Sequence, residues 1–175
     1  MNARESMIAL AGTLAAEIDF WTLSVDHICA RAGVDRAEFA ASFGDLDGYL
    51  VAVQEAFMDR LRDRLIAVTS GVPSGVRRVQ LATESFLDTC LKQRPLRAWL
   101  LQARGRPPVY ASLRRRLRIY WVLVGAELRA MGWRDGVAGA RLYMAMVDAA
   151  TSIEHRTGRQ EKVRAALWHF IEHGG

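Results

Sequence analysis

The sequence contains few cysteines and few prolines, and it has no long uncharged apolar run. Its two cysteines, Cys29 and Cys90, lie inside helical patterns, which favours buried free thiols in a reducing compartment over a disulfide. No stretch approaches the roughly 18 uncharged residues of a membrane span, and the N-terminal residues lack the basic start and apolar run of a signal peptide. Strand-like alternation is absent as well. We therefore expect an all-α, soluble protein of the cytoplasm.

The chain is basic overall but acidic at its N-terminal end. Its 175 residues carry a formal net charge of +5, and 51% hydrophobic residues supply a core for one domain or for a small module joined to a larger one. Residues 1–50 hold three basic and eight acidic side chains, a net charge of −5, whereas the remainder holds 21 basic and 11 acidic ones. Proteins grip DNA phosphates through Lys and Arg. The charge therefore argues against nucleic-acid binding by the first 50 residues.

One stretch, SVDHICARAGVDRAEFAASF, predicts two short helices joined by a tight turn. Ser24 is suited to cap the first helix, whose apolar positions recur at steps of three and four. Gly33 follows the last apolar position and suits the left-handed backbone of a sharp turn. Asp35 is placed to cap the second helix, in which Phe39 and Phe43 lie four residues apart and face inward. Such a pair forms either a DNA-reading helix-turn-helix or an ordinary helical hairpin.

Apolar periodicity predicts further helices, separated by Gly and Pro. Phe20 and Trp21, at the bend before Ser24, are expected to be buried anchors, with an exposed Trp21 near a DNA backbone as the alternative. The segment SGVPSG at residues 70–75 is the clearest boundary in the chain. We expect the other helices at about residues 3–18, from the segment GDLDG to about residue 69, and at 76–94, 95–104, 109–131, 135–156 and 159–173.

With these elements, the chain resembles the tetracycline-repressor (TetR) family of bacterial transcriptional regulators. The resemblance lies in the first helix, in the patterns SVxxIC and AGVD with a closing Phe, and in a following helix that begins YLxxV. It implies a three-helix DNA-binding module at residues 1–46 and a helical ligand-binding and dimerisation domain at residues 47–175. Proteins of this family are homodimers that pair their last two helices, and most are repressors released by a small molecule.

Carried onto this sequence, the family's DNA-reading surface corresponds to the cap of the first short helix and the outer side of the second. Ala40 stands where a phosphate-contacting Tyr is usual, Ser42 where a His or a similar polar residue is usual, and the next helix begins without the usual Lys. Each departure removes a contact that positions a protein on DNA, which leaves Arg36 as the strong donor. The candidate DNA-binding residues are Ser24, Arg36, Ala37, Glu38, Ala40 and Ser42.

The aromatic residues of the C-terminal part are candidates for a pocket that binds an apolar or aromatic effector. Aromatic residues at helical spacing belong to a core more often than to a pocket, so both interpretations stay open. The candidate ligand-binding residues are Phe86, Cys90, Trp99, Gln102, Tyr110, Tyr120, Trp121 and Tyr143. The broad apolar faces of the last two helices predict a homodimer interface formed by Met146, Ala149, Ile153, Leu167, Trp168, Phe170 and Ile171.

Two functions of different classes are open at this point. The capped helix-turn-helix favours a ligand-responsive homodimeric transcriptional regulator, a repressor that binds operator DNA through Arg36 and its neighbours. The acidic balance favours a protein of the same fold that has lost DNA binding and serves as a small-molecule-binding or protein-interaction subunit. A small helical enzyme ranks third, because a phosphate loop and a nucleophile motif are missing and His169 and His173 lack a third metal ligand. We expect no enzyme activity, cofactor or metal.

Overall fold

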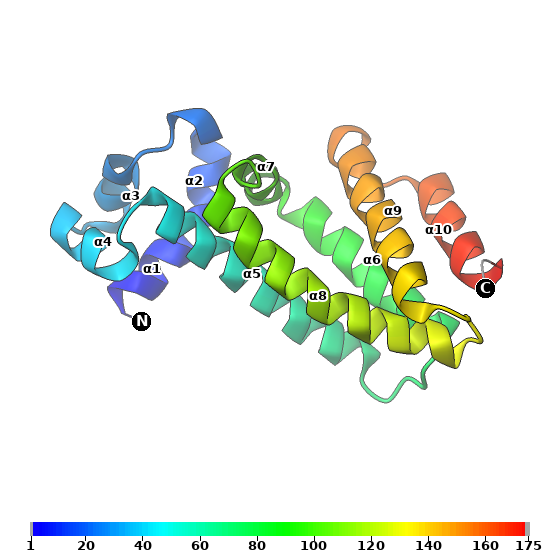
Figure 1. The fold of residues 1–175 in the computed structure, drawn as a ribbon. Helices are drawn as coiled ribbons and strands as arrows, with labels where there is room; N and C mark the ends of the chain where they lie inside the picture. The colour runs from blue at the N-terminus through cyan, green and yellow to red at the C-terminus, as the bar shows by residue number, and fades with distance from the viewer. Residues whose placement is uncertain (1, 174–175) are drawn as a thin grey trace. The chain divides into compact units, whose positions relative to one another are not determined.

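All regular structure of the protein is helical in residues 2–173, which the computed structural model describes (Figure 1). The predicted all-α fold class is therefore confirmed. The chain forms two compact units. The first contains the residues up to Arg60 and Gln93–Arg114, and the second contains Leu61–Lys92 and the residues from Arg115 onward. Among the described residues, no helix is both long and apolar enough to span a membrane.

Two helices, α5 (Leu46–Thr69) and α8 (Pro107–Ala130), contribute residues to both units. The first unit otherwise holds α1 (Ala3–Ala9), α2 (Ala11–Glu17), the 3-10 helix η1 (Phe20–Thr22), α3 (Val25–Ala32), α4 (Arg36–Phe43) and α7 (Arg94–Ala103). The second unit otherwise holds α6 (Val76–Lys92), α9 (Gly136–Thr157) and α10 (Glu161–His173). These bounds follow the predicted helices closely from α3 onward.

The helix predicted at residues 3–18 is divided at Leu10 into α1 and α2. The Leu10 backbone itself keeps a right-handed helical conformation. The hydroxyl of Tyr49 donates a hydrogen bond of 3.1 Å to the carbonyl of Met7, in the last turn of α1. A side chain that bonds to a helix carbonyl competes with the regular backbone ladder and bends the helix. This contact, made by a residue 42 positions away, gives no signal in the local sequence.

The predicted burial of the Phe20 and Trp21 pair is correct for one member only. Phe20 is 5% exposed, whereas Trp21 is 76% exposed, and the two rings lie 5.2 Å apart in an edge-on contact. Phe20 also lies 6.4 Å from the ring of Trp99, whose indole N–H donates to the carbonyl of Ile18 at 3.1 Å. Phe20 and Trp99 thus join α2 to α7, which pack against each other. Trp21 stays free for contacts outside the chain.

Packing in the first unit also brings the end of α4 against the start of α5. A Cβ atom at Gly48 would lie only 1.9 Å from the carbonyl oxygen of Phe43, so no larger residue fits here without a backbone shift. Glycine at this position is therefore required by close approach and not by a left-handed backbone.

Replacement of Gly48 by alanine should destabilise the protein. We expect Gly48→Ala to lower the free energy of unfolding by about 1–3 kcal/mol, because the added methyl group overpacks against the backbone. Thermal and denaturant unfolding measure this change. Gly12→Ala is the matched control, since a Cβ at Gly12 in α2 meets nothing within 4 Å and alanine favours the helix. Equal stability of Gly48→Ala and wild type would contradict the close approach.

The second unit has its core between α6, α9 and α10, which pack against one another. Helices α8 and α9 approach closely where Gly136 faces the carbonyl of Gly125, at a distance of 2.2 Å from an added Cβ. The core residues are Val79, Leu87, Leu128, Ala140, Tyr143, Val147, Ala150, Leu167 and Ile171. Several large apolar side chains of this unit stay exposed outside that core, namely Ile66, Ile119, Val122, Leu123 and Leu142.

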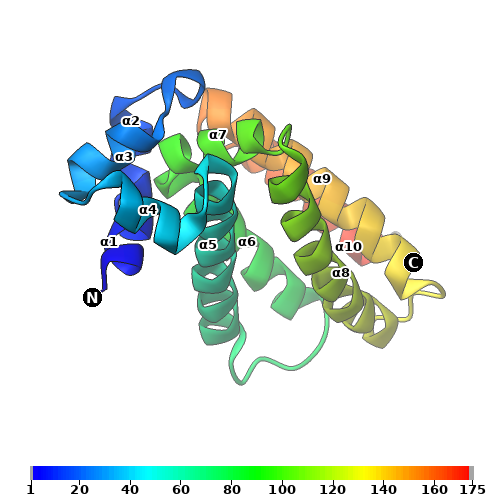
Figure 2. The same ribbon diagram turned by 60° about the vertical axis from the view of Figure 1, so that its left-hand side comes forward.

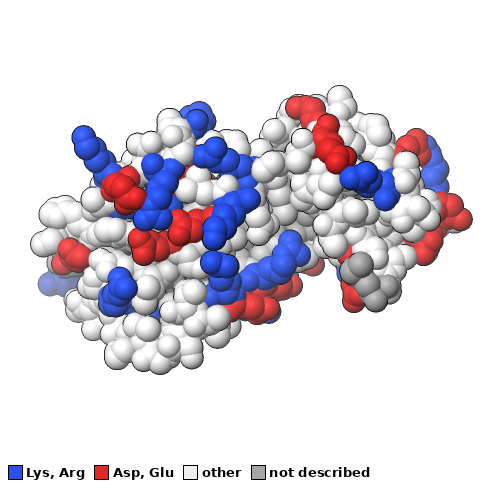
Figure 3. Space-filling model, turned by 180° about the vertical axis from the view of Figure 1, so that it is seen from behind, with Lys and Arg blue, Asp and Glu red and all other residues white. Residues whose placement is uncertain are grey.

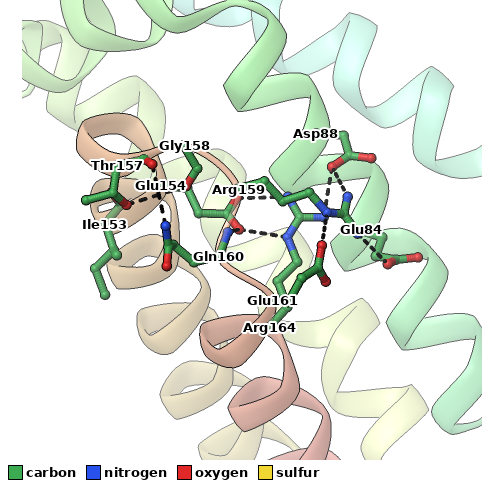
Figure 4. A network of polar contacts seen from close by, with 10 residues as sticks. All are labelled: Glu84, Asp88, Ile153, Glu154, Thr157, Gly158, Arg159, Gln160, Glu161 and Arg164. Atoms are coloured by element: carbon green, nitrogen blue, oxygen red, sulfur yellow. Dashed lines mark hydrogen bonds and ion pairs between the residues drawn. The ribbon is translucent and has the colours of Figure 1, made fainter.

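A buried ion pair fixes the connection between α9 and α10 (Figure 4). Glu154 and Arg164 are both 1% exposed. The Nε and Nη2 atoms of Arg164 donate to the two carboxylate oxygens of Glu154 at 2.7 and 2.8 Å, and Nη1 donates to Asp88 on α6 at 2.8 Å. The backbone N–H of Gln160 donates to the same carboxylate at 3.0 Å. Three helices therefore meet at one guanidinium group.

The pKa of Glu154 reflects this environment. Burial favours the neutral carboxyl, but the hydrogen bonds from Arg164 and from the Gln160 N–H outweigh it and hold the pKa below its ordinary value. A carboxyl whose pKa is lowered by folding stabilises the folded state at neutral pH. That contribution decreases once the pH falls below the ordinary value of 4.5 and is lost below the lowered pKa.

Removal of this charge should cost much of the stability of the second unit. We expect Glu154→Gln to lower the free energy of unfolding at pH 7 by about 3–5 kcal/mol, because Arg164 keeps its charge in a buried position. The difference from wild type should shrink below about pH 4.5, as Glu154 becomes protonated in both folded and unfolded chains. Denaturant unfolding across a pH series measures both effects.

Glu161→Gln serves as the control for that prediction. Glu161 also pairs with an arginine, Arg159, but its side chain is 72% exposed. Exposed ion pairs contribute little, about 0–1 kcal/mol. A similar loss of stability in both variants would show that burial of the Glu154–Arg164 pair is not the cause.

Candidate nucleic-acid interface

The two helices of the predicted helix-turn-helix have the expected caps. The Oγ atom of Ser24 accepts a hydrogen bond from the His27 N–H at 3.4 Å, and Oδ1 of Asp35 accepts from the Glu38 N–H at 2.8 Å. Gly33 ends α3 in the left-handed conformation, with φ 69° and ψ 32°. These contacts satisfy backbone groups that helix ends leave free. The tight turn between α3 and α4 is therefore confirmed.

Aromatic packing holds α4 in place from its inner side. The rings of Phe39 and Phe43 lie 5.2 Å apart, and Tyr49 of α5 lies 6.0 Å from the first and 5.2 Å from the second. Tyr49 and Phe39 are almost completely buried. Figure 2 shows α4 beside α3 and α1, both of which it contacts. This arrangement is a helix-turn-helix with its second helix presenting one face to solvent.

The exposed face of α4 offers little to a DNA phosphate. Arg36, Ala37, Glu38 and Ala40 are exposed, whereas Ser42 is half-buried. Of these residues, Arg36 alone carries a positive charge, and Glu38 carries a negative one. Glu38 could accept a hydrogen bond from the N4 amino group of cytosine but would repel a phosphate. Any DNA contact of this face depends mainly on Arg36.

Arg36 is already engaged by an acidic residue of α3. Its Nε and Nη2 atoms donate to the two carboxylate oxygens of Asp26 at 2.7 and 2.5 Å. This hydrogen-bonded contact lowers the pKa of Asp26 and raises the pKa of Arg36 relative to their ordinary values. Both groups therefore stay charged at neutral pH, and the two N–H donors that face Asp26 are occupied.

The other arginines of residues 2–59 also have partners inside the module. The guanidinium of Arg31 donates to Glu17 at 3.0 Å, and that of Arg4 lies 5.4 Å above the ring of Phe43. Figure 3 shows one face of the protein, on which basic side chains lie next to acidic ones. The acidic excess of the first 50 residues is thus accompanied by internal pairing of their few cations.

The junction of α4 with α5 is acidic as well. Oδ1 of Asp45 accepts a hydrogen bond from the Gly48 N–H at 2.8 Å and so caps the start of α5. Asp47 pairs with Arg106, the residue directly before α8, in the same unit. A helix N-terminus attracts phosphate when its N–H groups are free, and here aspartate side chains stand at that position. Carboxylate acceptors thus stand at the start of α5, where the resemblance to the TetR family predicts a Lys that contacts the DNA backbone.

Comparison with solved structures places this geometry in a known fold. No protein-family model and no curated protein matches the sequence. A transcriptional regulator from Rhodococcus sp. Rha1 is similar, with a TM-score of 0.82, 22% identity, and coverage of 97% of this chain and 94% of that one. A TetR-like transcriptional regulator from Rhodococcus sp. RHA1 gives a TM-score of 0.74 and 19% identity, over 97% and 93%. The fatty acid degradation regulator FadR from Bacillus halodurans gives 0.77 and 13%, over 99% and 96%.

The chain has the TetR-like fold. The similarity covers almost the whole chain, so it extends the resemblance from the first 55 or so residues to the C-terminal helices. At such low identities the comparison establishes the fold alone, and the roles of individual residues rest on their own geometry.

Within this TetR-like fold, the predicted ligand-binding residues are divided between the two units. Phe86, Cys90, Tyr120, Trp121 and Tyr143 belong to the second, and Trp99, Gln102 and Tyr110 to the first. Trp99 and Tyr143 are buried core residues, and the hydroxyl of Tyr143 lies 2.8 Å from that of Thr83. Cys90 is buried, Tyr110 is exposed, and Phe86, Gln102, Tyr120 and Trp121 are half-buried. Their role in binding a ligand stays a prediction.

The predicted dimer residues of the TetR-like fold also differ in exposure. Leu167 and Ile171 are buried in the core of the second unit, whereas Ala149 is exposed on α9. Met146, Ile153, Trp168 and Phe170 are half-buried.

The rings of His169 and His173 lie 4.4 Å apart, and the described residues contain no group of three or more side chains placed to hold a metal ion.

Two residues of interest escaped the sequence analysis. Asp26 gave no signal, because its pairing with Arg36 depends on how the turn brings α3 and α4 together. Gln54 of α5 is 2% exposed, and its side-chain oxygen has no hydrogen-bond partner among the described residues. It occupies a position four residues after Leu50 on the apolar stripe of α5, and a polar residue on such a stripe was the available signal.

Loss of the cap on α4 should weaken the module. We expect Asp35→Ala to lower the free energy of unfolding by about 1 kcal/mol, because the Glu38 N–H loses its acceptor. Asp35→Asn retains an acceptor oxygen and should stay close to wild type. Denaturant unfolding compares the three proteins, and an equal loss in both variants would assign the effect to charge in place of the cap.

Proposed function

We propose that the protein is a transcriptional regulator that binds operator DNA through its N-terminal helix-turn-helix. The observation that carries this proposal is the complete helix-turn-helix: both helices are capped, the turn is tight, and α4 exposes its outer face. The TetR-like fold of the whole chain supports it, since several structures of that fold are described as transcriptional regulators. In this proposal residues 1–46 bind DNA, and the protein acts in the bacterial cytoplasm as a repressor.

The proposal includes a homodimer that responds to a small molecule. The C-terminal part, residues 47–175, would bind the effector and form the dimer through α9 and α10. The exposed Ala149 and Leu142 of α9 support close pairing with a second copy. Gln102 supports an effector with a hydrogen-bond donor, because its side-chain oxygen is buried and lacks a partner among the described residues.

A second function is favoured by a specific observation, the internal pairing of Arg36 with Asp26. If the module no longer binds DNA, the protein is a ligand-binding or protein-interaction subunit of the same fold. Its acidic N-terminal surface and the exposed Trp21 would then face a protein partner. This alternative differs from the first in one measurable property, the retention of double-stranded DNA.

Binding to fragmented genomic DNA of the source organism tests the proposed function. We expect wild-type protein at low salt to enrich specific fragments, and Arg36→Ala to lose at least about tenfold in affinity, since Arg36 is the only cation of α4. Arg62→Ala, which removes an exposed arginine of the second unit, is the matched control and should keep its DNA.

Sedimentation and circular dichroism of the same samples establish that each variant is folded and report its oligomeric state. Absence of any retained DNA, from a folded dimer at low salt, would overturn the regulator and support the second function. Equal enrichment of DNA by wild type and Arg36→Ala would show that Arg36 does not contribute to DNA binding.

A further inference from the structure

Cations are scarce on the proposed DNA-binding surface. Arg36 is the only Lys or Arg between residues 32 and 59, a segment that holds six acidic side chains. Affinity for DNA depends chiefly on cations that replace the counterions of phosphates. The state of this one guanidinium group therefore determines most of what α4 can contribute to DNA binding.

Asp26 and Arg36 form a two-point contact in which Nε and Nη2 each meet one carboxylate oxygen. A phosphate binds arginine in the same two-point manner and uses the same edge of the guanidinium. Asp26 thus occupies the edge that would otherwise be offered to a DNA phosphate, and its negative charge stays beside any phosphate that approaches.

The contact between Asp26 and Arg36 lies on the surface of the module. Both side chains are largely exposed, 73% for Arg36 and 62% for Asp26. Exposed ion pairs are weak and are screened by salt, so DNA can displace Asp26, but at a cost in affinity. The contact limits DNA binding without preventing it.

We propose that Asp26 sets the DNA affinity of the module by competing with phosphate for Arg36. This inference rests on the proposed function and adds a residue of α3 that restrains the recognition helix from within. It implies that the acidic module binds DNA weakly, and that its affinity for DNA rises when Arg36 no longer pairs with Asp26.

Asp26→Ala tests the competition. We expect this variant to bind the enriched DNA about fivefold more tightly than wild type, the fold-change that corresponds to loss of one exposed ion pair. The gain should be largest at low salt and should decrease as the salt concentration rises, because salt screens the exposed Asp26–Arg36 pair. The gain should disappear in the double variant Asp26→Ala/Arg36→Ala.

Glu17→Ala is the matched control. It removes one negative charge from the same module, from an exposed ion pair with Arg31 that does not involve α4. Circular dichroism and thermal unfolding verify that all variants are folded. Equal gains from Asp26→Ala and Glu17→Ala, or a gain that persists without Arg36, would overturn the competition and leave general charge as the cause.

Weaker binding by Asp26→Ala would also overturn it and would identify Asp26 as a residue that positions Arg36 for contact. Failure of the inference is distinct from failure of the proposed function. If wild type binds DNA and Asp26→Ala binds no more tightly, only the inference fails. If neither protein binds DNA at low salt, both fail.

Discussion

The position of α4, the second helix of the helix-turn-helix, depends on one cluster of three aromatic rings, Phe39, Phe43 and Tyr49. Tyr49 belongs to α5, packs on both phenylalanines, and donates through its hydroxyl to the Met7 carbonyl of α1. One side chain therefore links α1, α4 and α5. Because these contacts all lie on the inner side of α4, the outer side can change its charge without loss of the fold. The separation of the packed inner side of α4 from its exposed outer side therefore allows an acidic helix-turn-helix to keep the fold.

Because of this separation, the fold and the affinity for DNA depend on different residues. The TetR-like fold is retained at identities of 13–22% because apolar spacing and capping residues suffice to specify it. Affinity for DNA follows instead from a few cations whose effect depends on their immediate neighbours. In this module the side chain next to Arg36 is the carboxylate of Asp26. The same backbone thus accommodates a strong DNA binder, a weak one or a module with another partner.

The sequence predicted those features that depend on local chemistry. Ser24, Gly33 and Asp35 are a cap, a left-handed glycine and a second cap, each recognisable from its immediate neighbours. The features it did not predict depend on contacts between distant residues. The break at Leu10 involves Tyr49, and the burial of Phe20 but not Trp21 is decided by the ring of Trp99. The Asp26–Arg36 pair joins residues ten positions apart on α3 and α4, so it depends on how the turn places the two helices. Apolar periodicity indicates helices but not such contacts between side chains of different helices.

The exposed apolar residues of the second unit bear on how two copies would pair. On α8, Ile119, Val122 and Leu123 are exposed together with Arg115 and Arg118. Pairing of two α8 helices would bring arginines of the two copies close to one another, and like charges without partners oppose association. On α9, Leu142 and the exposed alanines 138, 145 and 149 form a stripe with one arginine, Arg141, whose guanidinium lies 4.8 Å above the ring of Trp121. Small side chains allow helices to approach closely. In the proposed dimer, the charge distribution therefore favours α9 over α8 as the surface that would meet the second copy.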